Sequence, residues 1–247
     1  MHNTAFRSTG YNGTYLAFPI ASLGRDTIDG LKALGIKGFS VTIPHKVTIM
    51  DFLDEIDDTA QKIGAVNTVL NDNGRLIGSN TDYIGAINAL EEKTSIKNKD
   101  VVMIGAGGAA RAVGYGILSQ GGNLSIVNIL QDEGERLAAD LGVNYHPLSD
   151  VNTLDYQILV NTTPVGMTPD TDNMPVSPED LKPGAVVMDI IYNPLRTKLL
   201  TEAEKIGCTT IDGISMFVFQ GVAQFELWTG KDAPLELMRQ TVLESLH

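Results

Sequence analysis

The sequence predicts a two-unit α/β protein, and three observations support this. Short β-branched runs alternate with amphipathic helical patterns through most of the 247 residues, which is typical of a parallel sheet covered by helices. A polar stretch at 91–100, EEKTSIKNKD, has the composition of a linker. After residue 213 the alternation stops and two helical patterns follow. We therefore expect one domain from residues 1–90 together with 215–247, and a second domain from 100–213.

The individual elements follow from the periodicity of the apolar residues. The expected strands are 14–18, 38–43, 101–104, 124–128, 158–161, 186–191 and 209–211. The expected helices are 27–34, 47–56, 83–91, 109–120, 133–141, 198–206, 215–228 and 234–246. A hairpin is expected where 65–70 and 75–79 flank Asp72-Asn73-Gly74, because Asn-Gly favours a tight two-residue turn.

Composition excludes several classes of partner. Lys and Arg total 18 against 30 Asp and Glu, and the net charge of −12 argues against nucleic acid or anionic lipid. No apolar run approaches the roughly 20 residues of a membrane span, and no Cys/His/Asp/Glu cluster has the spacing of a metal site. The single cysteine, Cys208, fits a reducing compartment. We expect a cytoplasmic monomer or homodimer without a metal.

A glycine-rich turn follows the apolar strand expected at 101–104. Residues 105–111, GAGGAAR, place Gly105, Gly107 and Ala110 at the spacing G-x-G-x-x-A between a strand and a helix. In that context glycine lets backbone amides approach a pyrophosphate at the positive end of the helix. A turn without a ligand is the alternative, but the strand–turn–helix context favours a dinucleotide. The second domain is therefore predicted to be a Rossmann domain that binds NAD or NADP.

Further motifs stand in a fixed order over nearly the whole chain. They are SVTIPHK at 40–46, GAVNT at 64–68, NTD at 80–82, the glycine turn, NTTPVGM at 161–167, DIIYNP at 189–194, and Gln220 in the helix that reaches ELWTG at 226–230. Each is weak alone, but together they make the chain resemble the shikimate dehydrogenases and their quinate-using relatives. The resemblance implies reversible NAD(P)-linked oxidation of shikimate to 3-dehydroshikimate, a step of aromatic amino acid biosynthesis.

The resemblance also implies roles for single residues. Lys46 is the expected acid/base, because hydride transfer needs a group that moves the hydroxyl proton. Asp82 is expected to hold the lysine ammonium, with capping of the following helix as its alternative. The implied substrate ligands are Thr42, Asn67, Tyr192 and Gln220. The implied cofactor ligands are Gly105, Ala106, Gly107, Gly108, Ala109, Asn128, Asn161, Thr162, Met167 and Gly213. Without the family pattern, several of these residues have ordinary structural explanations. Lys46 would be a solvated surface lysine, Asn67 would form a hairpin hydrogen bond, and Tyr192 would be a buried core residue.

Two departures from the family pattern affect the expected function. Family members usually carry a strand and a Ser-x-Ser-Pro segment before the position of Met1, and the two serines hold the substrate carboxylate. We expect either a longer natural chain or weak substrate binding. In addition, Ile129 stands where most members have an arginine for the NADP 2′-phosphate, and no Lys or Arg occurs from Asn123 through Glu135. The sequence therefore predicts a preference for NAD over NADP, with Arg111 as the one alternative cation.

Three other functions compete with shikimate oxidation. A catabolic quinate dehydrogenase shares the same motifs. A non-catalytic dinucleotide-binding protein is disfavoured by the retention of both Lys46 and Asp82. A dehydrogenase of the methylenetetrahydrofolate type is disfavoured by the NTD motif together with Gln220.

Overall fold

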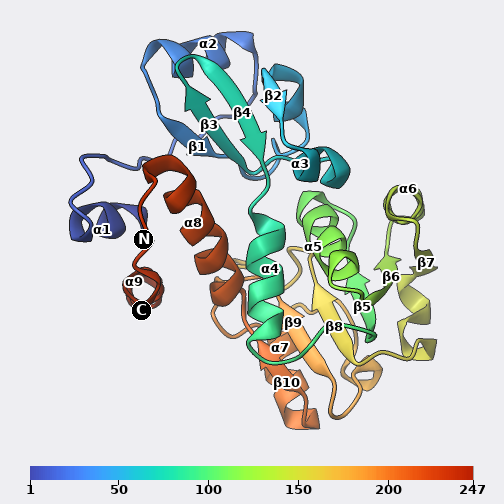
Figure 1. Cartoon of the computed structure of the whole chain (residues 1–247). Helices are drawn as coiled ribbons and strands as arrows, with labels where there is room; N and C mark the ends of the chain where they lie inside the picture. The colour runs from blue at the N-terminus through green and yellow to red at the C-terminus, as the bar shows by residue number, and fades with distance from the viewer. Residues whose placement is uncertain (247) are drawn as a thin grey trace.

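The computed structural model describes residues 1–246, and the strands within them form two sheets (Figure 1). The first sheet, in the order β1-β3-β4-β2, contains β1 (Gly38–Ser40), β2 (Glu55–Ile56), β3 (Thr68–Asp72) and β4 (Arg75–Ser79). The second, in the order β10-β9-β8-β5-β6-β7, contains β5 (Asp100–Ile104), β6 (Asn123–Asn128), β7 (Asn144–Pro147), β8 (Ile158–Asn161), β9 (Val186–Asp189) and β10 (Thr209–Ile211). The helices are α1 (His2–Ser8), α2 (Arg25–Ala33), α3 (Asp58–Ile63), α4 (Asp82–Glu91), α5 (Gly108–Ser119), α6 (Gln131–Leu141), α7 (Lys198–Ile206), α8 (Gly213–Thr229) and α9 (Leu235–Ser245).

The second sheet is parallel throughout and has the Rossmann strand order. Its neighbouring strands pair in parallel, and counting from β5 along the chain gives the order 3-2-1-4-5-6. Helices α4, α5 and α6 pack on one face, and α7 packs on the other. Residues of β8 and β9 are buried because both faces of the sheet are covered. The prediction of a Rossmann-type α/β fold is confirmed.

The first sheet is built around the predicted hairpin. Strands β3 and β4 pair antiparallel, with Asp72 opposite Arg75. The two turn residues, Asn73 and Gly74, have φ values of 53° and 93°. Positive φ at both positions is what a type I′ turn needs, and Asn-Gly supplies it at low cost.

Two helices connect the sheets. Helix α4 leads from β4 to β5, and α8 leads back from β10 along α4 (Figure 1). A Cβ at Gly85 of α4 would lie 2.5 Å from the carbonyl oxygen of Met216 in α8, so glycine permits this close approach. Farther along α8, Trp228 Nε1 donates to the Val69 carbonyl of β3 at 3.0 Å. Helix α8 therefore returns to the first sheet, as the sequence predicts, and α9 packs on α8 and α1.

The structure corrects several expected elements. Residues 14–18 form no strand, because the side chain of Asn3 bonds both the N–H and the C=O of Tyr15 in place of a neighbouring strand. The helix expected at 47–56 is a 3₁₀ turn, Thr48–Phe52, followed by β2, which pairs with β4 instead. Helices α1 and α3 and strand β7 have no counterpart among the expected elements. Across residues 1–246, no helix is both long and apolar enough to cross a membrane.

Candidate functional site

Lys46 and Asp82 form a shielded ion pair between the two sheets. Lys46 Nζ lies 2.6 Å from Asp82 Oδ2, and the side chains are only 15% and 8% exposed. Lys46 belongs to the loop after β1. Its backbone carbonyl oxygen accepts the N–H of Val66 at 2.8 Å, which fixes this part of the loop. Asp82 begins α4, directly after β4. Because an ammonium has three N–H donors, Lys46 keeps donors for a substrate hydroxyl after binding Asp82.

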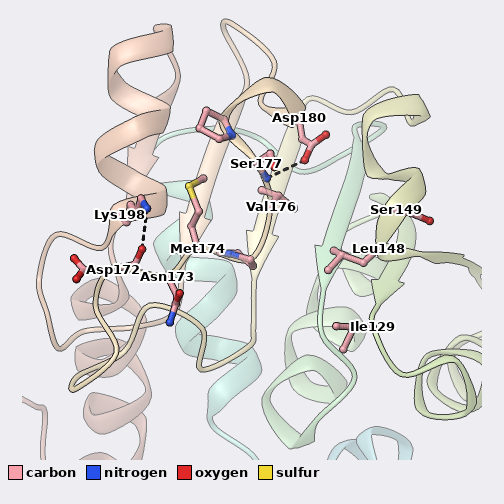
Figure 2. Close-up of a pocket in the computed structure, with 12 residues that line it drawn as sticks. Ile129, Leu148, Ser149, Asp172, Asn173, Met174, Val176, Ser177, Asp180 and Lys198 are labelled. Atoms are coloured by element: carbon pink, nitrogen blue, oxygen red, sulfur yellow. Dashed lines mark hydrogen bonds between the residues drawn. The ribbon is translucent and has the colours of Figure 1, made fainter.

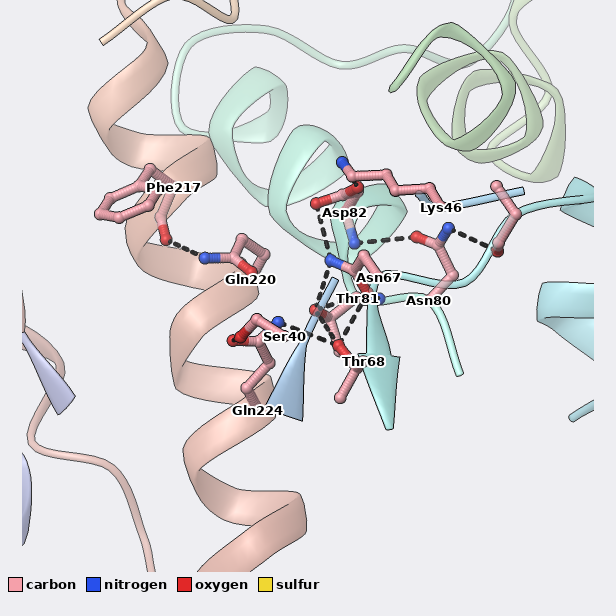
Figure 3. A network of polar contacts seen from close by, with 11 residues as sticks. Ser40, Lys46, Asn67, Thr68, Asn80, Thr81, Asp82, Phe217, Gln220 and Gln224 are labelled. Carbon is pink, nitrogen blue, oxygen red and sulfur yellow. Dashed lines mark hydrogen bonds and ion pairs between the residues drawn. The ribbon is translucent and has the colours of Figure 1, made fainter. Parts of the chain in front are cut away.

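Asn67 connects this ion pair to the hairpin (Figure 3). Its Nδ2 donates to Asp82 Oδ1 at 2.7 Å, so both carboxylate oxygens of Asp82 are occupied. Its Oδ1 accepts the backbone N–H of Thr81 at 2.7 Å. Asn67 is 2% exposed. The structure thus brings the predicted residues Lys46, Asp82 and Asn67 together.

The alternative role of Asp82 as a helix cap is not seen in the structure, because the N-cap residue of α4 is Thr81, without a side-chain cap. Asn80 Oδ1 accepts the backbone N–H of Asp82 at 3.0 Å, and Asn80 Nδ2 donates to the Ala65 carbonyl at 2.9 Å. The carboxylate of Asp82 is therefore free of the helix end and faces Lys46. Asn80 was not predicted as a functional residue, although it opens the NTD motif.

The glycine turn lies against the same lysine. A Cβ added at Gly108 would lie 3.5 Å from Lys46 Cβ. Gly107 is the N-cap of α5, with no side-chain cap and open space where its Cβ would be. The backbone donors at the start of this 12-residue helix are thus accessible, and they fit the phosphates of a dinucleotide. Gly105 has φ +112° and lies so close to Thr162 that a Cβ would come within 2.6 Å of the Thr162 hydroxyl oxygen.

Three predicted substrate ligands take no part in the hydrogen bonds of the ion pair. Thr42 is exposed in the loop before Lys46. Gln220 donates through Nε2 to the Phe217 carbonyl of its own helix at 2.7 Å (Figure 3). Tyr192 is 42% exposed and stacks on Phe217 with ring centroids 4.6 Å apart.

Several predicted cofactor residues bond within the protein. Asn161 is fully buried and donates to Asp189 Oδ1 at 3.1 Å, while Thr162 donates to the Ile104 carbonyl at 2.6 Å. Asn128 Nδ2 donates to the Leu130 carbonyl at 2.9 Å. These three side chains shape the carboxyl ends of the parallel strands, where open α/β sheets bind ligands.

The remaining predicted cofactor residues differ in exposure. Ala106 and Ala109 are half-buried in the glycine turn, and Met167 is 44% exposed. Gly213 begins α8, and a Cβ there would lie 2.4 Å from the Ile190 carbonyl oxygen. Gly213 therefore permits close packing of the polypeptide backbone at the start of α8.

The carboxyl group of Asp189 is buried beneath this edge. Burial raises its pKa to about 6, while hydrogen bonds from Thr197, Ile191 and Asn161 act in the opposite direction. Thr197 Oγ1 donates to Asp189 Oδ2 at 2.7 Å. Asp189 thus joins β8, β9 and the start of α7 beneath the edge that would hold a nicotinamide.

A pocket opens beside the end of β6 (Figure 2). Ile129, which is 78% exposed, lies on one side of it. Lys198 lines the opposite side and donates to the Asp172 carbonyl at 2.8 Å. Arg111, the alternative cation, pairs with Asp140 at 2.8 Å. Asp140 lies near the far end of α6, on the order of 12 Å along the helix from its start, so Arg111 is directed away from Ile129.

Residues 1–246 contain no group of three His, Cys, Asp or Glu side chains placed to hold a metal ion.

Known proteins match this chain along its whole length. The model of the shikimate dehydrogenase substrate binding domain matches residues 1–69, and that of the shikimate 5′-dehydrogenase C-terminal domain matches residues 213–243. A shikimate dehydrogenase (NADP(+)) of Methanococcus maripaludis is 48% identical over 253 residues, covering 98% of this chain and 90% of the relative. The chain belongs to the shikimate dehydrogenase family.

Solved structures of the family share the fold. A crystal structure of a shikimate dehydrogenase in complex with NADP+ is 44% identical, with a TM-score of 0.93 over 100% of this chain and 90% of that one. The Listeria monocytogenes shikimate 5-dehydrogenase in complex with shikimate and NAD is 33% identical, with a TM-score of 0.89 over 98% and 90%. The resemblance predicted from the sequence motifs is confirmed.

Sequence reasoning missed Thr68 and Gln224, two buried polar residues beside Asn67. Thr68 closes the GAVNT motif, and Gln224 lies one helical turn after Gln220. That i, i+4 spacing places both glutamines on one face of α8, and it was the available clue.

Proposed function

We propose that this chain is a shikimate dehydrogenase, which interconverts shikimate and 3-dehydroshikimate with a nicotinamide dinucleotide. The observation that carries the proposal is the Lys46–Asp82 ion pair in contact with Gly108 of the glycine turn. This arrangement puts a proton donor next to the open helix terminus that would bind the pyrophosphate.

The chain supplies proton transfer and positioning. A bound nicotinamide would accept or return the hydride. Lys46 Nζ gives its proton to the carbonyl oxygen during reduction and takes the hydroxyl proton during oxidation. Asp82 holds Nζ and balances its charge, and Asn67 fixes the carboxylate through its Nδ2.

The arrangement of the chain supports two domains with the site between them. Residues 1–90 and 215–247 would bind the substrate, and 100–213 would bind the dinucleotide. Thr42, Tyr192 and Gln220 have groups suited to hydroxyls or a carboxylate. For Gln220 this requires that its amide leave the Phe217 carbonyl when substrate binds.

The preference between the two cofactors is a separate part of the proposal. The relatives' names specify NADP(+), so they do not support the predicted preference for NAD. The residues at the end of β6 do support it, because Ile129 carries no charge and Asp132 and Glu133 are negative. We expect kcat/KM with NAD to exceed that with NADP, and we expect Ile129→Arg to raise kcat/KM for NADP. A clear advantage for NADP in the unchanged chain would contradict this preference.

Reduction of the dinucleotide, followed by its absorbance, tests the function directly. Shikimate and quinate should be supplied in turn with each cofactor. We expect turnover with shikimate, while turnover with quinate alone would make the chain a quinate dehydrogenase. If a folded sample oxidises neither acid, the proposed function is wrong.

A further inference from the structure

A line of buried hydrogen bonds runs from helix α8 to the catalytic ion pair (Figure 3). Gln224 Nε2 donates to Thr68 Oγ1 at 3.0 Å, and Thr68 Oγ1 donates to Asn67 Oδ1 at 2.7 Å. Asn67 in turn donates to Asp82. Gln224 is 1% exposed and Thr68 is 0% exposed. Buried polar groups destabilise a fold unless each has a partner, so these bonds constrain one another.

The backbone N–H of Thr81 determines which group donates and which accepts in each of these hydrogen bonds. The N–H of Thr81 can only donate, and it meets Asn67 Oδ1 at 2.7 Å. The nitrogen of the Asn67 amide must therefore face Asp82. The Thr68 hydroxyl has one proton, and it donates this proton to Asn67 Oδ1, its shortest hydrogen bond. Thr68 Oγ1 therefore acts as the acceptor for Gln224 Nε2.

The other half of the Gln224 amide is bonded as well. Its Oε1 accepts from Ser40 Oγ at 2.8 Å, and Ser40 Oγ accepts from the Tyr15 hydroxyl at 2.7 Å. With a donor on one side and an acceptor on the other, the amide has one favourable orientation. Gln224 therefore anchors Thr68 from α8, on the side away from the ion pair.

We propose that Gln224 and Thr68 are positioning residues for the reaction, an inference that rests on the function proposed above. Neither side chain is hydrogen-bonded to Lys46 or Asp82, so both act through Asn67. They hold the Asn67 amide so that its nitrogen, and not its oxygen, faces the Asp82 carboxylate. A flipped amide would place oxygen against oxygen and displace both Asp82 and Lys46. Displacements near 1 Å in a catalytic group can cost on the order of 100-fold in rate.

Two substitutions of similar volume test this role. Thr68→Val removes the hydroxyl, and Gln224→Met removes the amide, while both keep the space filled. Because the N–H of Thr81 still favours the correct amide orientation, we expect kcat to fall about tenfold and KM for shikimate to change less than about twofold. Thr68→Ser restores the hydroxyl and should restore kcat. The double variant should lose little more than Thr68→Val alone, because both residues act through one line.

Trp228→Phe is the matched control. It removes another buried hydrogen bond between α8 and β3, to Val69, the residue next to Thr68. We expect it to lower the Tm and leave kcat unchanged. If Thr68→Val does not fold, the kcat of Gln224→Met alone tests the inference. A folded variant with kcat within twofold of the unchanged chain overturns the inference, as does a rise in KM alone. Failure of the unchanged chain to oxidise shikimate would instead overturn the proposed function.

Discussion

Lys46 and Gly108 are 62 positions apart in the sequence, yet a Cβ at Gly108 would lie 3.5 Å from the Cβ of Lys46. One residue follows the edge strand of the first sheet, and the other opens the first helix of the Rossmann sheet. In the proposed function Lys46 transfers the proton and the glycine turn binds the dinucleotide, so this short separation would place both in one site. The predictions below test the parts of that site separately.

Replacing Lys46 should remove proton transfer. We expect Lys46→Ala to lower kcat by about 10²- to 10⁴-fold, the usual contribution of an acid/base group, with a much smaller change in KM. Steady-state kinetics with shikimate measure both constants. Lys62→Ala, at an exposed lysine of α3, is the control and should behave like the unchanged chain. Near-normal kcat in Lys46→Ala would remove this lysine from the chemistry.

Asp82→Asn tests whether the carboxylate positions the lysine. An amide keeps the shape but cannot balance the ammonium, so we expect a loss of kcat comparable to that of Lys46→Ala. Since Asn80, and not the Asp82 carboxylate, accepts the backbone N–H of Asp82, the helix should persist. Circular dichroism and kinetics on one sample separate the two effects. A variant that loses only stability would assign Asp82 a structural role.

Alanine at two glycines of the turn should affect different properties, cofactor binding at Gly107 and stability at Gly105. At Gly107 a Cβ meets no atom within 4 Å, so Gly107→Ala should keep the Tm but raise the KM for the dinucleotide about tenfold by blocking its phosphates. At Gly105 the φ of +112° and the Thr162 contact at 2.6 Å make Gly105→Ala destabilising by roughly 1–3 kcal/mol. Thermal melts and cofactor titrations distinguish the two. Unchanged cofactor KM in Gly107→Ala would place the pyrophosphate elsewhere.

Asp189 should make stability depend on pH. Its pKa is raised to about 6 from 3.8, so the protonated carboxyl is favoured in the folded state. Its contribution to the free energy of unfolding is fully present below pH 3.8 and is lost as the pH rises through 6, a total of about 3 kcal/mol.

Asp189→Asn should lack this dependence. We expect the unfolding free energy of the unchanged chain, relative to the variant, to fall by about 2 kcal/mol between roughly pH 4.5 and 7.5. Urea unfolding at both pH values measures it. Other titrating groups, such as His2 with its pKa lowered by burial to about 4, are common to both proteins and largely cancel. A constant difference would show that Asp189 does not titrate in this range.

The sequence by itself determined the elements whose signals are local. The Gly105–Ala110 spacing needs only a strand before it and a helix after it, and the Asn73-Gly74 turn needs only two residues with positive φ. Family resemblance then identified Lys46, Asp82 and Asn67 as site residues, and the structure brings these three together.

Only the tertiary structure decided which polar side chains support that site. Gln224 meets Thr68 across 156 positions, and Asn80 Oδ1, not the Asp82 carboxylate, accepts the backbone N–H of Asp82 at the start of α4. Residues 14–18 have a strand-like pattern but no strand partner, since side-chain bonds from Asn3 satisfy Tyr15. In each case the deciding bond joins groups far apart in the chain or chooses between two nearby acceptors. Periodicity and local propensity carry no information about such pairings, because they describe one segment at a time.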